Sequence, residues 1–328
     1  MNKNILDVLS EKIINDNYLV TKEDIYKIIG LPEIFIFDII AASHRITKYY
    51  KKDKVFTCAI INAKSGSCSQ DCAFCAQSSY HKVKIDSYQM LLEDDIVEYA
   101  IKMEKAGATQ FSIVTSGHRL NQKEINCICK VNKIISYETN LKICASLGMI
   151  NIDNAYQLKE SGLKRYHHNL ETAKSYFDKI CTTHKYEEDV ETIKNVQKSG
   201  LRICSGGIIG LGENWDDRIE LGFLLNDLNV DSIPLNFLNP ISGTKLENQP
   251  ILDPFVALKT IAIFRFINSN KDITICGGRE ITLKDLQAFI FPSGANGIMI
   301  GNYLTTKGRD ANSDLDMIDA LKMVILAI

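Results

Sequence analysis

This sequence has no marked excess of charge, no long apolar run and no linker-like segment. Its 38 Lys and Arg residues nearly balance its 40 Asp and Glu residues, so the charge pattern does not indicate a nucleic acid or an anionic membrane as partner. The apolar runs at 34–37 and 323–328 are far shorter than the ~20 residues that span a bilayer. Residues 1–20 mix apolar and charged side chains, without the apolar core of a signal peptide. We therefore expect a cytoplasmic protein that acts on a small ligand.

Short β-branched runs alternate with longer segments of helical period from about residue 55 onward. No break rich in Pro, Gly or Ser divides this alternation into two domains. The pattern predicts an α/β fold, a single (β/α)8 TIM-type barrel over 51–328, with an N-terminal helical cap over 1–50. Functional residues are expected at the carboxyl ends of the barrel strands. The predicted strands are 55–62, 110–116, 142–147, 164–170, 202–209, 232–238, 272–278 and 297–302.

Three of the ten cysteines are close together, directly after the first predicted strand. Cys68, Cys72 and Cys75 form a C-x3-C-x2-C pattern, and in a reducing cytosol such clustering favours metal ligation or redox chemistry over disulfides. Structural zinc usually takes four ligands, whereas three thiolates on a four-iron cluster leave one iron open for a substrate or cofactor. A zinc knuckle completed by His81, or three thiols without metal, are the alternatives.

The C-x3-C-x2-C motif on the first loop of a barrel resembles the radical S-adenosylmethionine (SAM) enzymes, and further motifs resemble the biotin synthase family among them. The resemblance implies a [4Fe-4S] cluster on Cys68, Cys72 and Cys75, whose open iron binds SAM. It also implies cleavage of SAM to a 5′-deoxyadenosyl radical and sulfur insertion into dethiobiotin at two unactivated carbons, giving biotin. The six motifs, in family order, are 65–79, 165–172, 204–213, 234–244, 277–280 and 303–306.

Several polar and glycine positions are candidates for binding SAM. Phe74 lies beside the last cysteine of the loop and indicates a loop shaped around a ligand. Gly206 and Gly207 permit close backbone approach, so a flat adenine fits against this turn, although a tight packing turn would look the same. In the family this turn borders SAM, and residues at the positions of Asn169 and Glu171 serve the substrate and the SAM ribose. The family acid is Asp, and Glu171 is one methylene longer.

The substrate residues are also assigned by resemblance. His167 shares a strand face with Asn169 and stands where many relatives have Asn. Asn236 is expected between SAM and substrate, or else is a hydrogen-bonded core amide. Thr305 and Thr306 resemble the hydroxyl pair that binds the substrate carboxylate.

A second iron–sulfur cluster is implied by the resemblance, as the sulfur donor. The family pattern is a cysteine on each of barrel strands two, three and five and an arginine on strand seven. This chain has Cys144 and Cys204, but Ser112 and Thr274 replace the other two. Cys276, two residues beyond Thr274, faces the same side and restores a third thiolate, unless it is a plain core residue.

We therefore expect an auxiliary [4Fe-4S]-type cluster on Cys144, Cys204 and Cys276, with one iron open to exogenous sulfide, as in a variant subgroup that lacks the arginine. The alternative is a [2Fe-2S] cluster with Ser112 as an oxygen ligand. The remaining cysteines are interpreted as structural: Cys58, Cys127, Cys129 and Cys181.

Partners and rival functions follow from the same resemblance. Expected partners are dethiobiotin, SAM, a flavodoxin or ferredoxin-type electron donor and a second copy of the chain in a homodimer. The rival functions are another radical SAM enzyme, such as a hydrogenase-maturation protein, and an iron–sulfur protein without catalytic activity. A lipoyl synthase would carry a separate N-terminal three-cysteine motif, which this sequence lacks.

Overall fold

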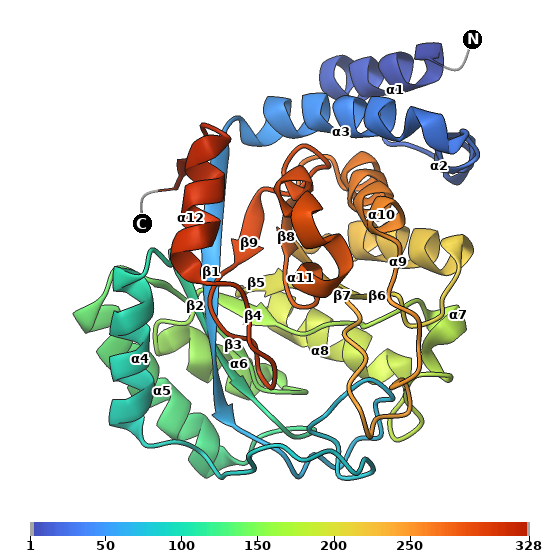
Figure 1. Cartoon of the computed structure of the whole chain (residues 1–328). Coiled ribbons are helices and arrows are strands. Elements are labelled where there is room, and N and C mark those ends of the chain that lie inside the picture. The colour runs from blue at the N-terminus through green and yellow to red at the C-terminus, as the bar shows by residue number, and fades with distance from the viewer. Residues whose placement is uncertain (1–2, 327–328) are drawn as a thin grey trace.

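Eight parallel strand positions close into a barrel in the computed structural model, which describes residues 3–326 (Figure 1). The barrel closes because β1 pairs with both β2 and β9. The predicted TIM-type fold is confirmed. The ten strands are β1 (Lys54–Lys64), β2 (Gln110–Thr115), β3 (Lys142–Ser146), β4 (Arg165–His167), β5 (Arg202–Cys204), β6 (Gly207–Ile209), β7 (Ser232–Phe237), β8 (Asp272–Ile275), β9 (Gly297–Met299) and β10 (Val324–Ile325).

Four of the predicted strands differ from the observed ones. The strands predicted over 272–278 and 297–302 end early, at Ile275 and Met299. The segment predicted over 202–209 is interrupted, so that β5 and β6 share the fifth barrel position and β7, β8 and β9 take positions six to eight. The interruption lies at Gly206, whose carbonyl accepts backbone hydrogen bonds from Leu170 and Glu171 instead of a regular ladder partner. The strand predicted over 164–170 ends at His167 for the same reason. Its last residues leave the sheet and form the barrel mouth.

The helices cover the outside of the barrel, with their apolar faces on the strands. Asn121 and Glu124 form a capping box that starts α5, as the sequence preference for Asn before a helix predicts. The surrounding helices are α4 (Glu93–Lys105), α5 (Gln122–Glu138), α6 (Ile152–Glu160), α7 (Lys174–Phe177), α8 (Tyr186–Lys198), α9 (Trp215–Asp227), α10 (Pro254–Ile267), α11 (Arg279–Leu283) and α12 (Ala311–Ala320), with 3-10 turns at Glu33–Phe35 and Lys284–Ile290.

Three N-terminal helices lie across the end of the barrel where β1 begins (Figure 1). They are α1 (Lys3–Asp16), α2 (Lys22–Ile29) and α3 (Ile36–Lys51), and they share a separate apolar core with α9 and α10. An ion pair of 2.9 Å between Lys51 and Asp272 joins α3 to the start of β8. Residues 1–2 of the predicted cap and 327–328 of the predicted barrel lie outside the described residues. The long loops at the opposite, carboxyl end of the strands are therefore left to form the site.

Candidate active site

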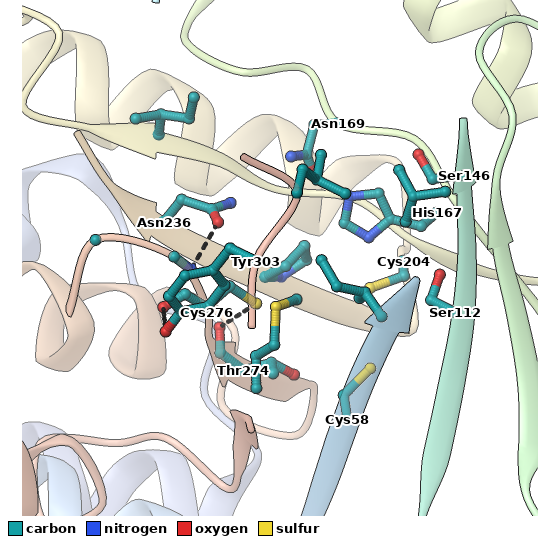
Figure 2. Close-up of a pocket in the computed structure, with 18 of the residues that line it drawn as sticks. Cys58, Ser112, Ser146, His167, Asn169, Cys204, Asn236, Thr274, Cys276 and Tyr303 are labelled. Atoms are coloured by element: carbon teal, nitrogen blue, oxygen red, sulfur yellow. Dashed lines mark hydrogen bonds between the residues drawn. The ribbon is translucent and has the colours of Figure 1, made fainter. Parts of the chain in front are cut away.

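A cavity of about 320 Å³ occupies the inside of the barrel and reaches its carboxyl end (Figure 2). Every barrel strand position contributes at least one lining residue. Phe74, from the three-cysteine loop, lines the same cavity as the interior cysteines. A ligand held by the loop would therefore face the barrel interior directly.

The three-cysteine loop leaves β1 and folds back on itself through backbone hydrogen bonds. The amide of Cys68 donates to the carbonyl of Gln77 at 3.0 Å, and the amide of Cys75 donates to the carbonyl of Cys72 at 3.0 Å. All three thiols are free and partly buried. Burial raises the pKa of the Cys75 thiol to about 11, so a bound cation is needed to keep it as a thiolate. His81 contacts the backbone carbonyl of Cys72 at 3.0 Å, which occupies the imidazole in a structural role.

Cys181 lies beside this loop, a contact that the sequence interpretation missed. Its Sγ is 3.9 Å from the Sγ of Cys72 and 3.3 Å from Nδ1 of His184. Asp189 holds both His184, at 3.1 Å, and His168, at 2.8 Å. The hydrogen bond from Cys72, together with that of His184, lowers the pKa of Cys181 to about 4 although burial opposes this. No sequence signal places residue 181 against residue 72, because the contact joins two loops 109 positions apart.

The polar segment after β4 enters the cavity mouth. His167, Asn169 and Glu171 all line the cavity; His167 does so from β4, whereas Asn169 and Glu171 follow the end of the strand, so that strand alternation does not account for their placement. Asn169 donates to the Glu171 carboxylate at 3.3 Å and accepts from the amide of Gly206 at 3.1 Å. Burial raises the pKa of Glu171 to about 8 and lowers the pKa of His167 to about 4. His167 is therefore neutral near pH 7, so its imidazole can both donate and accept a hydrogen bond.

The glycine turn between β5 and β6 is packed against neighbouring backbone. A Cβ on Gly206 would lie 1.9 Å from the carbonyl oxygen of Pro234, and one on Gly207 would lie 2.3 Å from that of Glu171. Side chains are therefore excluded at both positions. Close backbone packing thus accounts for these glycines, as in the packing turn that was considered as the alternative to an adenine-binding turn. Glu213, at the end of the motif, is a buried structural residue that pairs with Arg218 at 2.7 Å.

Asn236 and the threonine pair face the cavity from the other side. Asn236 accepts from the amide of Gly277 at 3.0 Å and donates to the carbonyl of Gly207 at 3.4 Å, so it connects the fifth, sixth and seventh barrel positions. Thr305 and Thr306 follow β9 and line the mouth. Tyr303 fixes this loop, because its hydroxyl donates to Glu280 at 2.7 Å and its amide donates to the carbonyl of Thr306 at 3.0 Å.

The interior cysteines are brought together deep in the cavity (Figure 2). Cys144 on β3, Cys204 on β5 and Cys276 after β8 are buried and line it with Thr274 and Ser112. Figure 2 shows Cys204 and Cys276 facing the cavity. Burial raises the pKa of Cys204 to about 11 and raises that of Cys276 further. Cys58, interpreted as structural from the sequence, lines the same cavity.

A buried guanidinium from β4 faces these thiols, a second feature that the sequence interpretation missed. Arg165 lines the cavity, donates to the side chain of Gln110 at 3.2 Å and lies 3.5 Å from the Asp272 carboxylate. Its charge opposes the rise that burial produces in the pKa of both Cys144 and Cys204. The barrel interior thus carries an arginine at strand position four.

The two thiol sets offer donors of the kind that iron–sulfur clusters take, in which each cysteine binds a different iron. Among residues 3–326, no group of three Cys, His, Asp or Glu side chains is placed to hold a single metal ion. The donor chemistry fits too, because both sets offer thiols and no bound partner such as a disulfide occupies them.

Two family models match adjoining parts of this chain. The Radical SAM superfamily model matches residues 64–225, and the model of the Biotin and Thiamin Synthesis associated domain matches residues 234–324. The first range holds the three-cysteine loop and the glycine turn, and the second holds Asn236, Cys276 and the threonine pair. Together they define a radical SAM barrel with an associated carboxyl-terminal region.

Curated relatives cover nearly the whole chain. The biotin synthase of Syntrophus aciditrophicus is 47% identical over 96% of this chain and 97% of its own length. That of Geotalea uraniireducens is 45% identical over 98% of both, and that of Carboxydothermus hydrogenoformans is 49% identical over 87% of this chain and 88% of its own. The chain belongs to the biotin synthase family.

Solved structures show the same fold at low sequence identity. The crystal structure of methylornithine synthase is similar with a TM-score of 0.85 at 18% identity, covering 97% of both chains. A maturase of the [FeFe]-hydrogenase is similar with a TM-score of 0.83 at 14% identity, covering 98% of this chain and 75% of its own. At these identities the likeness concerns the barrel and its N-terminal helices.

Proposed function

We propose that this chain converts dethiobiotin to biotin by radical SAM chemistry, with sulfur supplied by an auxiliary cluster inside the barrel. The observation that carries the proposal is the single cavity that joins Phe74 of the three-cysteine loop to Cys144, Cys204 and Cys276. A substrate in this cavity lies between a radical source at the mouth and a sulfur source below it. Membership in the biotin synthase family supports the choice of substrate.

Cys68, Cys72 and Cys75 hold the [4Fe-4S] cluster in this proposal. When bound, that cluster supplies the electron that cleaves SAM. SAM is bound by Phe74, Asn169, Glu171, Gly206, Gly207 and Asn236. The Glu171 carboxyl group, mostly protonated near pH 7, can both accept and donate hydrogen bonds with ribose hydroxyls. Gly206 and Gly207 leave the turn without side chains that would block the adenine. Asn169 keeps Glu171 in place through their 3.3 Å contact.

Dethiobiotin is proposed to contact His167, Asn169, Asn236, Thr305 and Thr306. The threonine hydroxyls donate to the substrate carboxylate, a role for which their place at the mouth is suited. The neutral imidazole of His167 and the two amides suit the uncharged ureido ring, which both donates and accepts hydrogen bonds.

The auxiliary site is proposed to hold four irons on Cys144, Cys204 and Cys276. These three thiolates leave one iron for a further ligand. The buried Arg165 guanidinium offsets part of their negative charge. The alternative is a two-iron cluster in which Ser112 is an oxygen ligand.

The remaining expectations belong to the same proposal. We propose the helical cap over 1–50 and the barrel over 51–328 as the functional division of the chain, a cytoplasmic homodimer, and a flavodoxin or ferredoxin-type protein as electron donor. No helix within residues 3–326 is long and apolar enough to cross a membrane.

Anaerobic incubation of the protein with SAM, a reductant, sulfide and dethiobiotin tests the function. Mass spectrometry should detect biotin together with methionine and 5′-deoxyadenosine. Methionine and 5′-deoxyadenosine without biotin would retain the radical SAM class and reject this substrate. Failure to cleave SAM under anaerobic reduction would instead favour an iron–sulfur protein without catalytic activity.

A further inference from the structure

Four cysteines, rather than three, line the interior of the barrel. Cys58 is on β1, Cys144 on β3, Cys204 on β5, and Cys276 directly follows β8 at the seventh position. They come from the four odd strand positions. In a TIM barrel, inward side chains from alternate strands form a layer of four. The four thiols therefore come from alternate strands, as the members of such a layer do, and Cys144 stands two residues further along in the register than Cys58.

The strand register supports this grouping. Cys58 is the register partner of Met299 on β9. Thr274 on β8 is the partner of Gly297, so Cys276, two residues further on, stands level with Met299 and hence with Cys58. On the other side Cys58 is the partner of Gln110, whose amide oxygen is 3.9 Å from the Sγ of Cys144. Cys58 thus lies between Cys276 and Cys144 around the barrel wall.

None of the four thiols is engaged in a strong interaction. The Sγ of Cys58 has a contact of 3.9 Å to the carbonyl of Ala59, and the Sγ of Cys276 has one of 3.8 Å to the carbonyl of Thr274. The thiols of Cys144, Cys276 and Cys204 lie close enough to Cys58 to interact with it electrostatically.

Ser112 is on β2, an even strand position. Its register partners are Ile60 on β1 and Cys144 on β3, so it stands level with Cys144 and two residues beyond Cys58. A hydroxyl is also a weaker ligand for iron than a thiolate. Figure 2 shows Cys58, Cys204 and Cys276 around the common cavity, with Ser112 on the neighbouring strand.

We propose that Cys58 is the fourth protein ligand of the auxiliary cluster, so that the resting cluster is held by Cys58, Cys144, Cys204 and Cys276. This inference rests on the auxiliary site proposed above. In that site one iron has no protein ligand, and here the thiolate of Cys58 binds this iron. The iron is then available to an outside ligand only where Cys58 is absent or displaced.

The test uses the full chain with Cys68, Cys72 and Cys75 replaced by Ala, so that only the auxiliary cluster remains. Into this parent, Cys58→Ala, Cys58→Ser and the control Cys127→Ala are introduced. Each protein is reconstituted anaerobically with iron and sulfide, and the reduced cluster is examined by EPR and Mössbauer spectroscopy with and without cyanide. Cys127 is on α5, outside the cavity.

We expect the parent and Cys127→Ala to show four thiolate-ligated irons and no response to cyanide. Cys58→Ala should bind cyanide with a shifted EPR signal, or lose its iron, and Cys58→Ser should show one iron with altered Mössbauer parameters. Equal spectra and equal cyanide response in the parent and both Cys58 variants would overturn the assignment. Cys144→Ala separates the two proposals, because retention of all iron in that variant would reject the auxiliary site itself.

Discussion

The Arg165 guanidinium lies 3.5 Å from the Asp272 carboxylate inside the barrel, below the interior thiols. Asp272 also pairs with Lys51 at 2.9 Å and accepts from Asn296 at 2.9 Å. Arg165 therefore connects an anion at the amino end of the barrel to the sulfur-rich cavity. Because an unpaired buried charge is costly, removal of either Arg165 or Asp272 is expected to leave the other charge destabilising the fold.

Replacement of Arg165 by Met should lower the free energy of unfolding of the cluster-free protein by about 3 kcal/mol. This value is near the low end for a broken buried ion pair, because Asp272 keeps Lys51 and Asn296 as partners. Urea unfolding measures this. Arg202→Met is the matched control, since Arg202 is half exposed and 3.9 Å from Asp272, and should cost less than about 1 kcal/mol. Equal losses in both variants would contradict the role of Arg165. In the reconstituted protein, loss of this cation should also lower the reduction potential of the auxiliary cluster.

Glu171 should make the stability of the cluster-free protein depend on pH. Burial raises its pKa from 4.5 to about 8. A carboxyl whose pKa is raised on folding contributes stability that is fully present below its unfolded pKa and is lost as the pH rises through the folded pKa. The free energy of unfolding of the unchanged protein should therefore fall by at least about 1 kcal/mol between pH 5 and 8. Glu171→Gln should lack this fall. Urea unfolding at each pH measures both proteins. Glu171→Asp keeps an acid as control, and a Gln variant with the unchanged pH profile would refute this account.

Gly206 should tolerate no side chain. A Cβ there would lie 1.9 Å from the carbonyl oxygen of Pro234, whereas one on Gly277 would lie 3.4 Å from Asn236. Gly206→Ala should cost about 3 kcal/mol or more, because two backbone segments must separate. Gly277→Ala should cost less than about 1 kcal/mol. Thermal unfolding measures the stability of both variants. A loss in Gly206→Ala as small as that in Gly277→Ala would contradict this prediction and show that the two backbone segments can separate at little cost.

Cys72 and Cys181 are adjacent but should differ in function. Cys72→Ala should remove about four irons per chain and abolish reductive SAM cleavage, since three cysteines hold the SAM-binding cluster. Cys181→Ala should retain the iron, because Cys181 belongs to the hydrogen-bonded group of His184 and Asp189. Iron assay and 5′-deoxyadenosine formation measure both. Comparable iron loss in Cys181→Ala would place this residue among the ligands.

The fold could be predicted from the sequence because strand and helix periods alternate eight times. All eight predicted strand positions are present in the barrel. Two of the differences, the short β4 and the divided β5 and β6, arise at Gly206, whose carbonyl accepts backbone hydrogen bonds from Leu170 and Glu171 at the barrel mouth. Such contacts join residues far apart in sequence, so local propensity does not report them.

The site was predicted best where a motif is local. The cysteine loop needed only spacing. Cys58, Arg165 and Cys181 were missed because their positions depend on barrel closure and on loop contacts. For Cys58 a signal was available, since it is on an odd strand position, as Cys144 and Cys204 are, and side chains from alternate strands meet inside a TIM barrel. Arg165 likewise precedes His167 by two residues and so faces the same side.

The iron and labile-sulfide content of anaerobically reconstituted protein tests the central claim, a SAM-binding cluster and a four-iron auxiliary cluster in one chain. The account predicts about eight irons per chain, four for each cluster. A content of about six irons would indicate a two-iron auxiliary cluster and would contradict it.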